Sequence, residues 1–169
     1  MSEVNKRAYT RFIELLNTQD FEALDQVVDP QRYREICVGF TPGWVDLEDA
    51  LDAYKRIPSG IPDLNARIDD IAAEGDRVYA RLTVTGTNTG RFFGMPPTGR
   101  SYKVNMFDYA RLEDGRIVER IQQSDTLSQL GQMYLGAAKK AAAVAGVGLL
   151  GAALLALGGR RRSRQRDRG

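Results

Sequence analysis

An aspartate and an arginine stand on either side of one predicted hairpin turn in the second half of the chain. The turn is Glu113-Asp114-Gly115, and two apolar strands flank it. If it is a three-residue loop with a left-handed Gly115, Asp108 pairs directly with Arg120. The two side chains would then share one face, and the guanidinium would lower the pKa of the aspartate. This pattern is consistent with an ion pair that only stabilises the fold, and also with an Asp–Arg pair that takes part in catalysis.

The 169 residues include no histidine. This composition removes the commonest general base at neutral pH and the commonest metal ligand, so no metal site is predicted. The single cysteine, Cys37, cannot form an internal disulfide. We interpret it as a buried apolar side chain rather than as a reactive thiol.

The net charge of +2 is unevenly distributed along the chain. Residues 1–136 hold 16 Lys and Arg against 21 Asp and Glu, whereas residues 137–169 hold eight basic residues and one acid. The length suits one domain, over residues 1–136, with a short appendage. Because the domain has no basic patch, no nucleic-acid partner is predicted.

Three helices are predicted before the first long strand. Apolar residues at helical spacing predict an amphipathic helix that begins near Val4. Asp20 can cap a short helix over Phe21–Val28. Asp46 can cap a third helix over Leu47–Arg56, which Pro58 is expected to end.

Four strands in two hairpins follow these helices. Their ranges are 64–74 with 77–87, and 101–112 with 116–125. A last helix over Thr126–Leu135 closes the domain. Helices followed by a meander of strands predict an α+β fold.

The C-terminal region contains a long uncharged segment, residues 141–159, after a linker over 137–140. As a helix it would reach about 28 Å, close to the ~30 Å of a bilayer core. We interpret it as a single-pass membrane anchor, with a basic tail over 160–169 that suits anionic lipid headgroups. The alternative is an apolar helix packed on the domain or on a partner. No secretory signal precedes the domain, which is therefore expected to be cytoplasmic; the topology of the anchor stays open.

The segment Gly86-Thr-Asn-Thr-Gly-Arg-Phe-Phe-Gly-Met-Pro-Pro-Thr-Gly-Arg100 resembles a signature loop of the SnoaL-like polyketide and ester cyclases. The resemblance extends from roughly Lys6 to Gln132 and includes Asn17-Thr18, Ile61-Pro-Asp-Leu64 and Leu112-Glu-Asp-Gly-Arg-Ile-Val118. It implies a curved antiparallel sheet wrapped around N-terminal helices, with a ligand pocket between them. Ketosteroid isomerase and scytalone dehydratase share this α+β cone.

The resemblance also implies three catalytic positions. Asp108 stands at the first of the inward-facing positions that carry the family's chemistry. Arg120 stands where the family usually has a histidine, and Gln122 stands where it usually has the aspartate that acts as general acid and base. Gln122 cannot titrate, but it can hydrogen-bond a carbonyl or an enol. Arg120 could hold an enolate oxygen, and Asp108 is left as the candidate base. The reaction implied is a cofactor-free intramolecular aldol closure.

A small, largely apolar or polyketide-like carbonyl compound is the expected ligand. Met95-Pro96-Pro97 is expected to stiffen the mouth of the pocket. The candidate ligand-binding residues are Phe40, Trp44, Tyr54, Phe92, Phe93, Met95 and Met106. A homodimer is also considered. The main alternative to a cyclase or isomerase is a non-catalytic ligand-binding or scaffold domain of the same fold, tethered to the membrane.

Overall fold

The computed structural model describes residues 2–41, 43–92 and 94–135. The chain divides into two compact units, 1–133 and 134–169, and the first holds the fold described below. Its elements in chain order are α1 (Ser2–Thr18), the 3-10 turn η1 (Glu22–Gln26), β1 (Arg34–Val38), β2 (Val45–Asp46), α2 (Leu47–Gly60), β3 (Asn65–Glu74), β4 (Arg77–Thr87), β5 (Ser101–Glu113), β6 (Arg116–Ser124) and α3 (Thr126–Leu130), followed by the π-helical segment η2 (Gly131–Leu135).

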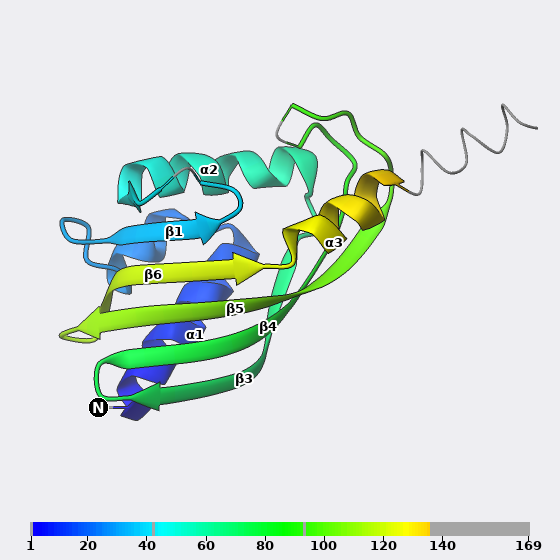
Figure 1. Cartoon of the computed structure of the whole chain (residues 1–169). Helices are drawn as coiled ribbons and strands as arrows, with labels where there is room; N and C mark the ends of the chain where they lie inside the picture. Colours follow the sequence, from blue (N-terminus) through cyan, green and yellow to red (C-terminus); the bar gives the residue numbers. More distant parts are fainter. Residues whose placement is uncertain (1, 42, 93, 136–169) are drawn as a thin grey trace, which may run out of the picture. The chain divides into compact units, whose positions relative to one another are not determined.

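The first helix packs one apolar stripe against the sheet. Tyr9, Phe12 and Leu15 of α1 follow helical spacing and are fully buried. Figure 1 shows α1, in dark blue, crossing the strands of the long meander. The predicted first helix and the α+β class are therefore confirmed.

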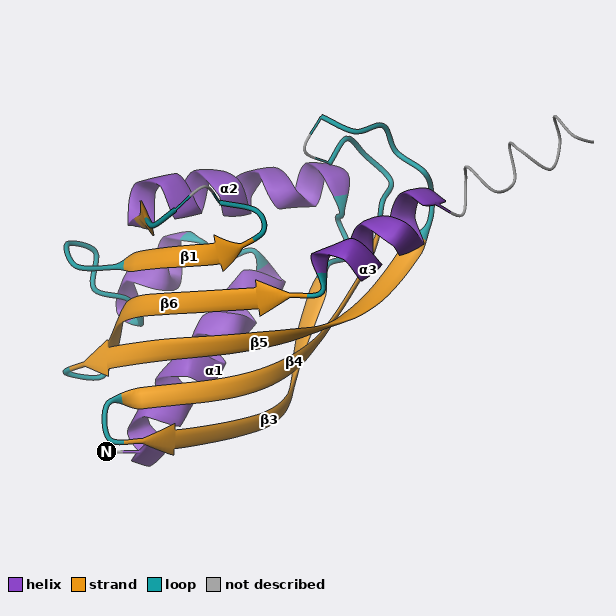
Figure 2. Ribbon diagram, viewed as in Figure 1, coloured by secondary structure: helices purple, strands orange, loops and turns teal. Residues whose placement is uncertain are grey.

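The sheet has six strands in the order β2-β1-β6-β5-β4-β3. Strands β3 to β6 form an antiparallel meander, but β1 pairs in parallel with β6, as Figure 2 shows. The prediction of a purely antiparallel sheet is wrong because it did not include β1. That strand occupies the free edge of β6 and runs in the same direction, which makes the sheet mixed.

The second helix begins as predicted and ends later. The Asp46 side chain accepts a hydrogen bond from the backbone N–H of Asp49 at 3.1 Å, which is an N-cap. The helix continues past Pro58 to Gly60, and the N–H of Ile61 donates to the carbonyl of Ile57 at 2.9 Å. The helix predicted over Phe21–Val28 is shorter, a single 3-10 turn.

The turn between β5 and β6 differs from the predicted three-residue loop. Asp114 and Gly115 both have positive φ, 50° and 76°, and form a two-residue turn of type I′. A bulge then shifts the register, so that Asp108 faces Gln122 and Arg120 faces Ala110. The predicted direct pairing of Asp108 with Arg120 is wrong.

The predicted linker (137–140), apolar helix (141–159) and basic tail (160–169) lie outside the described residues. Within the part of the chain that the structure describes, no helix has both the length and the apolar character needed to cross a bilayer. The predicted closing helix is present as α3, which continues into η2.

Candidate functional site

Two carboxylates and one guanidinium are buried together between α1 and the sheet. We call Glu35 of β1, Asp108 of β5 and Arg120 of β6 the buried ion cluster; their exposed fractions are 4%, 4% and 1%. Arg120 donates from Nε and Nη2 to Oδ2 of Asp108, at 2.9 and 2.8 Å. Its Nη1 donates to Oε2 of Glu35 at 3.0 Å. The predicted contact between Asp108 and Arg120 is therefore present, and Arg120 bridges two acids rather than one.

Three tyrosine hydroxyls complete the hydrogen bonding of the cluster. Tyr9 of α1 donates to Oδ2 of Asp108 at 2.7 Å. Tyr33 donates to Oε2 of Glu35 at 2.9 Å, and Tyr54 of α2 donates to the same oxygen. Tyr54 also accepts from Nη1 of Arg120 at 3.1 Å. One oxygen of each buried carboxylate thus accepts hydrogen bonds from several elements, which offsets part of the cost of burying its charge.

Burial and neighbouring charges act in opposite directions on the pKa values of Asp108 and Arg120. Burial raises the pKa of Asp108 above its ordinary value, although Arg120 and Tyr9 act in the opposite direction. The expectation of a lowered pKa is therefore wrong. Burial alone would lower the pKa of Arg120, but the charge of Asp108 leads the effects that raise it well above its ordinary value. Burial also raises the pKa values of Tyr9, Tyr33 and Tyr54, so all three hydroxyls stay protonated donors at neutral pH.

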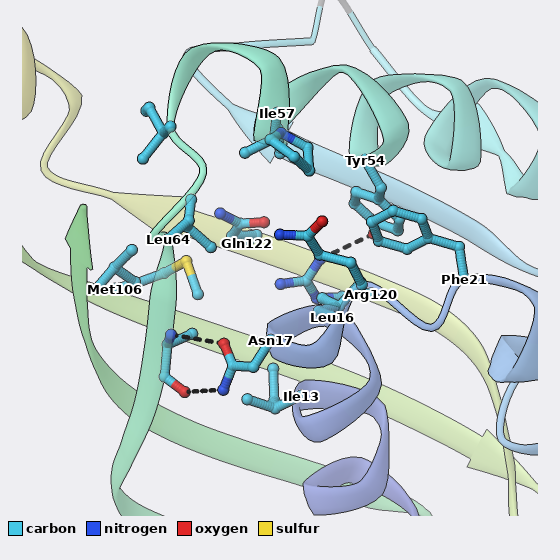
Figure 3. Close-up of a pocket in the computed structure, with 15 residues that line it drawn as sticks. Ile13, Leu16, Asn17, Phe21, Tyr54, Ile57, Leu64, Met106, Arg120 and Gln122 are labelled. Carbon is cyan, nitrogen blue, oxygen red and sulfur yellow. Dashed lines mark hydrogen bonds between the residues drawn. The ribbon is translucent and has the colours of Figure 1, made fainter. Parts of the chain in front are cut away.

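Two adjacent chambers lie between the helices and the concave side of the sheet. The Arg120 chamber, about 110 Å³, has Arg120 in its wall, and the Glu35 chamber, about 250 Å³, has Glu35 in its wall. Figure 3 shows the Arg120 chamber, with Gln122, Met106 and Tyr54 facing its interior. Six residues belong to both walls: Tyr54, Ile57, Leu64, Val84, Met106 and Gln122. We call these six residues the partition.

The two carboxylates of the cluster differ in their access to the chambers. Among the described residues that line the two chambers, Glu35 is the one acid. Its three donors all bind Oε2, which leaves Oε1 outside these bonds. Asp108 lines neither chamber, and its Oδ1 is buried without a hydrogen-bond partner in the described part of the chain. Glu35 is therefore the carboxylate that a molecule in these two chambers would meet, whereas Asp108 lines a different cavity of about 360 Å³, together with Tyr79 and Phe107.

Only some of the predicted ligand-binding residues line the two chambers. Tyr54 and Met106 belong to the partition, and Phe40 and Phe92 line the Glu35 chamber. Trp44 is 46% exposed and stacks under the Arg34 guanidinium, 4.7 Å from the ring centre. Neither Trp44 nor Met95 lines either chamber, and Phe93 lies outside the described residues. Ligand contact by any of these residues stays a prediction.

The signature loop is held against the end of α2 through its backbone. Asn88 is fully buried, and its Oδ1 accepts from the backbone N–H of Thr98 at 2.9 Å. The N–H groups of Thr89 and Gly90 both donate to the carbonyl of Gly60 at 3.0 Å. This attachment places Phe92 in the wall of the Glu35 chamber. The loop therefore positions part of the site.

Sequence reasoning missed Glu35 and Tyr9 as members of the site. Ile36 and Val38 are β-branched and favour a strand, but Glu35 breaks the alternation of apolar and polar residues. No local signal therefore marked Glu35 as facing inward. In the described residues, no group of three or more Cys, Asp or Glu side chains could hold a metal ion.

Comparison with known proteins agrees with this architecture. The profile of the family described as SnoaL-like polyketide cyclase matches residues 6–133. A curated relative, nogalonic acid methyl ester cyclase from Streptomyces nogalater, is 35% identical over 74 residues, which cover 41% of this chain and 55% of the relative. The match thus spans about half the length of that relative.

Solved structures with the same fold cover most of the described chain. IdmH, a proposed polyketide cyclase from Streptomyces antibioticus, is 30% identical, with a TM-score of 0.69 over 76% of this chain and 96% of its own. TsrD from Streptomyces laurentii is 28% identical, with a TM-score of 0.66 over 77% of this chain and 94% of its own.

Proposed function

Because the chain belongs to the SnoaL-like polyketide cyclase family, we propose that its chambers bind a small, largely apolar carbonyl compound and promote enolate chemistry on it. The reaction class is intramolecular aldol cyclisation or isomerisation. One observation carries the proposal: a buried carboxylate, Glu35, lines the larger chamber with one oxygen anchored and the other outside those bonds. An anchored carboxylate beside an apolar cavity is a suitable general base.

In the proposed reaction Glu35 is the base. Its Oε1 removes a proton from the carbon next to the ligand carbonyl, and the electron pair moves onto the carbonyl oxygen. The enolate carbon then attacks a second carbonyl of the same molecule, forming a C–C bond. The alkoxide that results takes up the proton held by Glu35. No electrons enter or leave, so the step is balanced without a co-reactant.

The other polar groups of the cluster have supporting roles in this proposal. The amide of Gln122 lies in the partition and can donate a hydrogen bond to the developing enolate oxygen. Arg120 holds Glu35 in place and compensates its charge. Asp108 contacts Arg120 and Tyr9 from behind the chambers, so we assign it a positioning role.

The test measures proton abstraction directly, so it does not require the natural substrate. Exchange of the methyl protons of 2-acetylnaphthalene in D₂O is followed by NMR, with wild type, Glu35→Gln and Asp108→Asn. General base catalysis contributes about 10²–10⁴-fold, and Glu35→Gln should lose that factor. Asp108→Asn should retain at least about a tenth of the wild-type rate, because Glu35 is still in place.

Two outcomes would contradict the proposal. If Asp108→Asn loses the exchange and Glu35→Gln keeps it, the base is Asp108, as the family resemblance implied. If wild type binds 2-acetylnaphthalene in calorimetry but exchanges no protons, the second hypothesis, a ligand-binding or scaffold domain, is the better one.

A further inference from the structure

A further cavity, of about 340 Å³, lies beside the Glu35 chamber, between the end of α2 and the signature loop. We call it the vestibule. Ala53, Ile57 and Phe92 belong to its wall and also to the wall of the Glu35 chamber, so the two cavities adjoin. Figure 1 shows the loop, in green, beside the end of α2. One molecule can therefore extend from the chamber into the vestibule.

The wall of the vestibule is positively charged. Arg56 of α2 and Arg91 of the loop line it, and no acid does so among the residues that the structure describes. This differs from residues 1–136 as a whole, in which acids outnumber basic residues. Guanidinium groups bind carboxylates and phosphates through paired, charge-assisted hydrogen bonds. The wall therefore favours an anion.

Both guanidiniums have donors that a bound anion can use. Arg56 pairs with Asp52 of its own helix at 3.7 Å, and the two side chains are 80% and 64% exposed, so this ion pair is weak. Arg91 is exposed, and its Nη1 donates to the carbonyl of Gly94 at 3.2 Å. That bond fixes Arg91 to the loop and leaves its Nε and Nη2 for a ligand.

The C-terminal end of α2 acts against an anion, but more weakly than the arginines attract one. A helix C-terminus carries a partial negative charge of roughly half an elementary charge, whereas the arginines carry two full charges. The carbonyl of Gly60 also accepts from the N–H groups of Thr89 and Gly90 at 3.0 Å, and that of Ile57 accepts from Ile61 at 2.9 Å. These bonds occupy carbonyl groups that contribute to the partial charge.

We propose that the vestibule is an anion subsite, which binds a carboxylate or phosphate group of a molecule whose uncharged part occupies the Glu35 chamber. Arg56 holds the anion from the helix and Arg91 holds it from the loop. The apolar residues shared by the two walls contact the chain that joins the anion to the uncharged part. The place of the uncharged part rests on the proposed function, whereas the anion subsite rests on the arginines.

Three probes that share one ring system and one flexible chain test the subsite on the full-length protein. They are 4-(6-acetylnaphthalen-2-yloxy)butanoic acid, its methyl ester and 4-(6-acetylnaphthalen-2-yloxy)butyl phosphate, measured by calorimetry. The acid or the phosphate should bind about tenfold more tightly than the neutral ester. This gain should shrink about threefold between about 50 mM and 500 mM salt, because salt screens exposed charges. A gain for one anion alone identifies the class of group that the subsite takes, and equal affinities for all three probes would overturn the proposal.

Variants of the two arginines locate the gain. Arg56→Gln and Arg91→Gln should each reduce it about threefold, and the double variant should remove it without weakening the methyl ester. The matched control is Arg11→Gln, which should keep the whole gain. Arg11 is also exposed and pairs with an acid of its own helix, Glu14, at 3.4 Å, but it lines neither the chambers nor the vestibule. A double variant that keeps the gain would refute the assignment.

These outcomes are distinguishable from failure of the proposed function, because the gain is measured by binding and not by proton exchange. A gain for an anionic probe without proton exchange from 2-acetylnaphthalene would contradict the enzymatic role and leave the anion subsite standing. Proton exchange without any gain would do the reverse.

Discussion

Arg120 forms ion pairs with two buried carboxylates through a single guanidinium. Replacing it by methionine keeps much of the volume but leaves Asp108 and Glu35 without a compensating charge. Breaking a buried ion pair in this way costs about 3–5 kcal/mol. We expect a loss of that size for Arg120→Met in urea unfolding at pH 7, and a smaller loss when Asp108→Asn is added. A loss below about 1 kcal/mol would show that the cluster is better solvated than its burial indicates.

The raised pKa values of tyrosine hydroxyls and of one thiol predict a loss of stability at alkaline pH. Burial raises the pKa of Tyr102 from 10.0 to about 12 and that of Cys37 from 9.0 to about 11. In the window from pH 9 to 12 the unfolded chain therefore binds fewer protons than the folded one, and the free energy of unfolding falls as pH rises. Below pH 9 both groups are protonated in the folded and the unfolded chain, so their contribution to the free energy of unfolding is fully present.

Urea midpoints measured at pH 8, 9, 10 and 11 check this slope. Tyr9, Tyr33 and Tyr54 add to it, since burial raises their pKa values in the same direction. Tyr102→Phe should flatten the slope between pH 10 and 11, because one titrating group is removed. A midpoint that stays constant across the series would contradict the assigned burial.

At the scale of elements, the contact between the signature loop and α2 depends on glycine. A Cβ at Gly90 would lie 1.9 Å from the carbonyl oxygen of Ser59, whereas a Cβ at Gly43 meets no atom within 4 Å. Gly90→Ala should therefore destabilise the fold by about 1–3 kcal/mol and weaken ligand binding, because Phe92 moves with the loop. Gly43→Ala is the matched control and should stay within about 0.5 kcal/mol of wild type. Thermal unfolding of the two variants measures the effect on stability, and calorimetry measures the effect on ligand binding.

Local signals were sufficient for α1, for the start of α2 and for both hairpins. They were not sufficient for β1, whose pairing partner β6 is distant in sequence, and Glu35 was missed with it. The contact between Asp108 and Arg120 was predicted correctly from a wrong register. The two-residue turn moves the register by one residue and the bulge by one more, so both side chains return to the same face. Neither shift could be read from local sequence.

At the scale of the whole molecule, the tail and the domain are expected to be separable. The first compact unit ends at Met133 and contains the complete buried core described above. A variant without residues 137–169 should therefore unfold in urea at the same midpoint as the full chain. The membrane anchor over 141–159 stays a prediction, and fractionation of the full chain tests it. Recovery of all the protein in the soluble fraction at low and high salt would contradict it.

The parallel pairing of β1 with β6 has a consequence for the order in which the site is completed during synthesis. Glu35 and Arg120 are 85 residues apart, and translation at about 5–20 residues per second separates them by about 4–17 s. During that interval β1 has no sheet edge to join, because β6 has not yet left the ribosome. Helix α1 and the β3–β4 hairpin can associate earlier. The carboxylate we assign as the base therefore reaches its place only after nearly the whole domain has been made, so a nascent chain is expected to complete its site no earlier than its sheet.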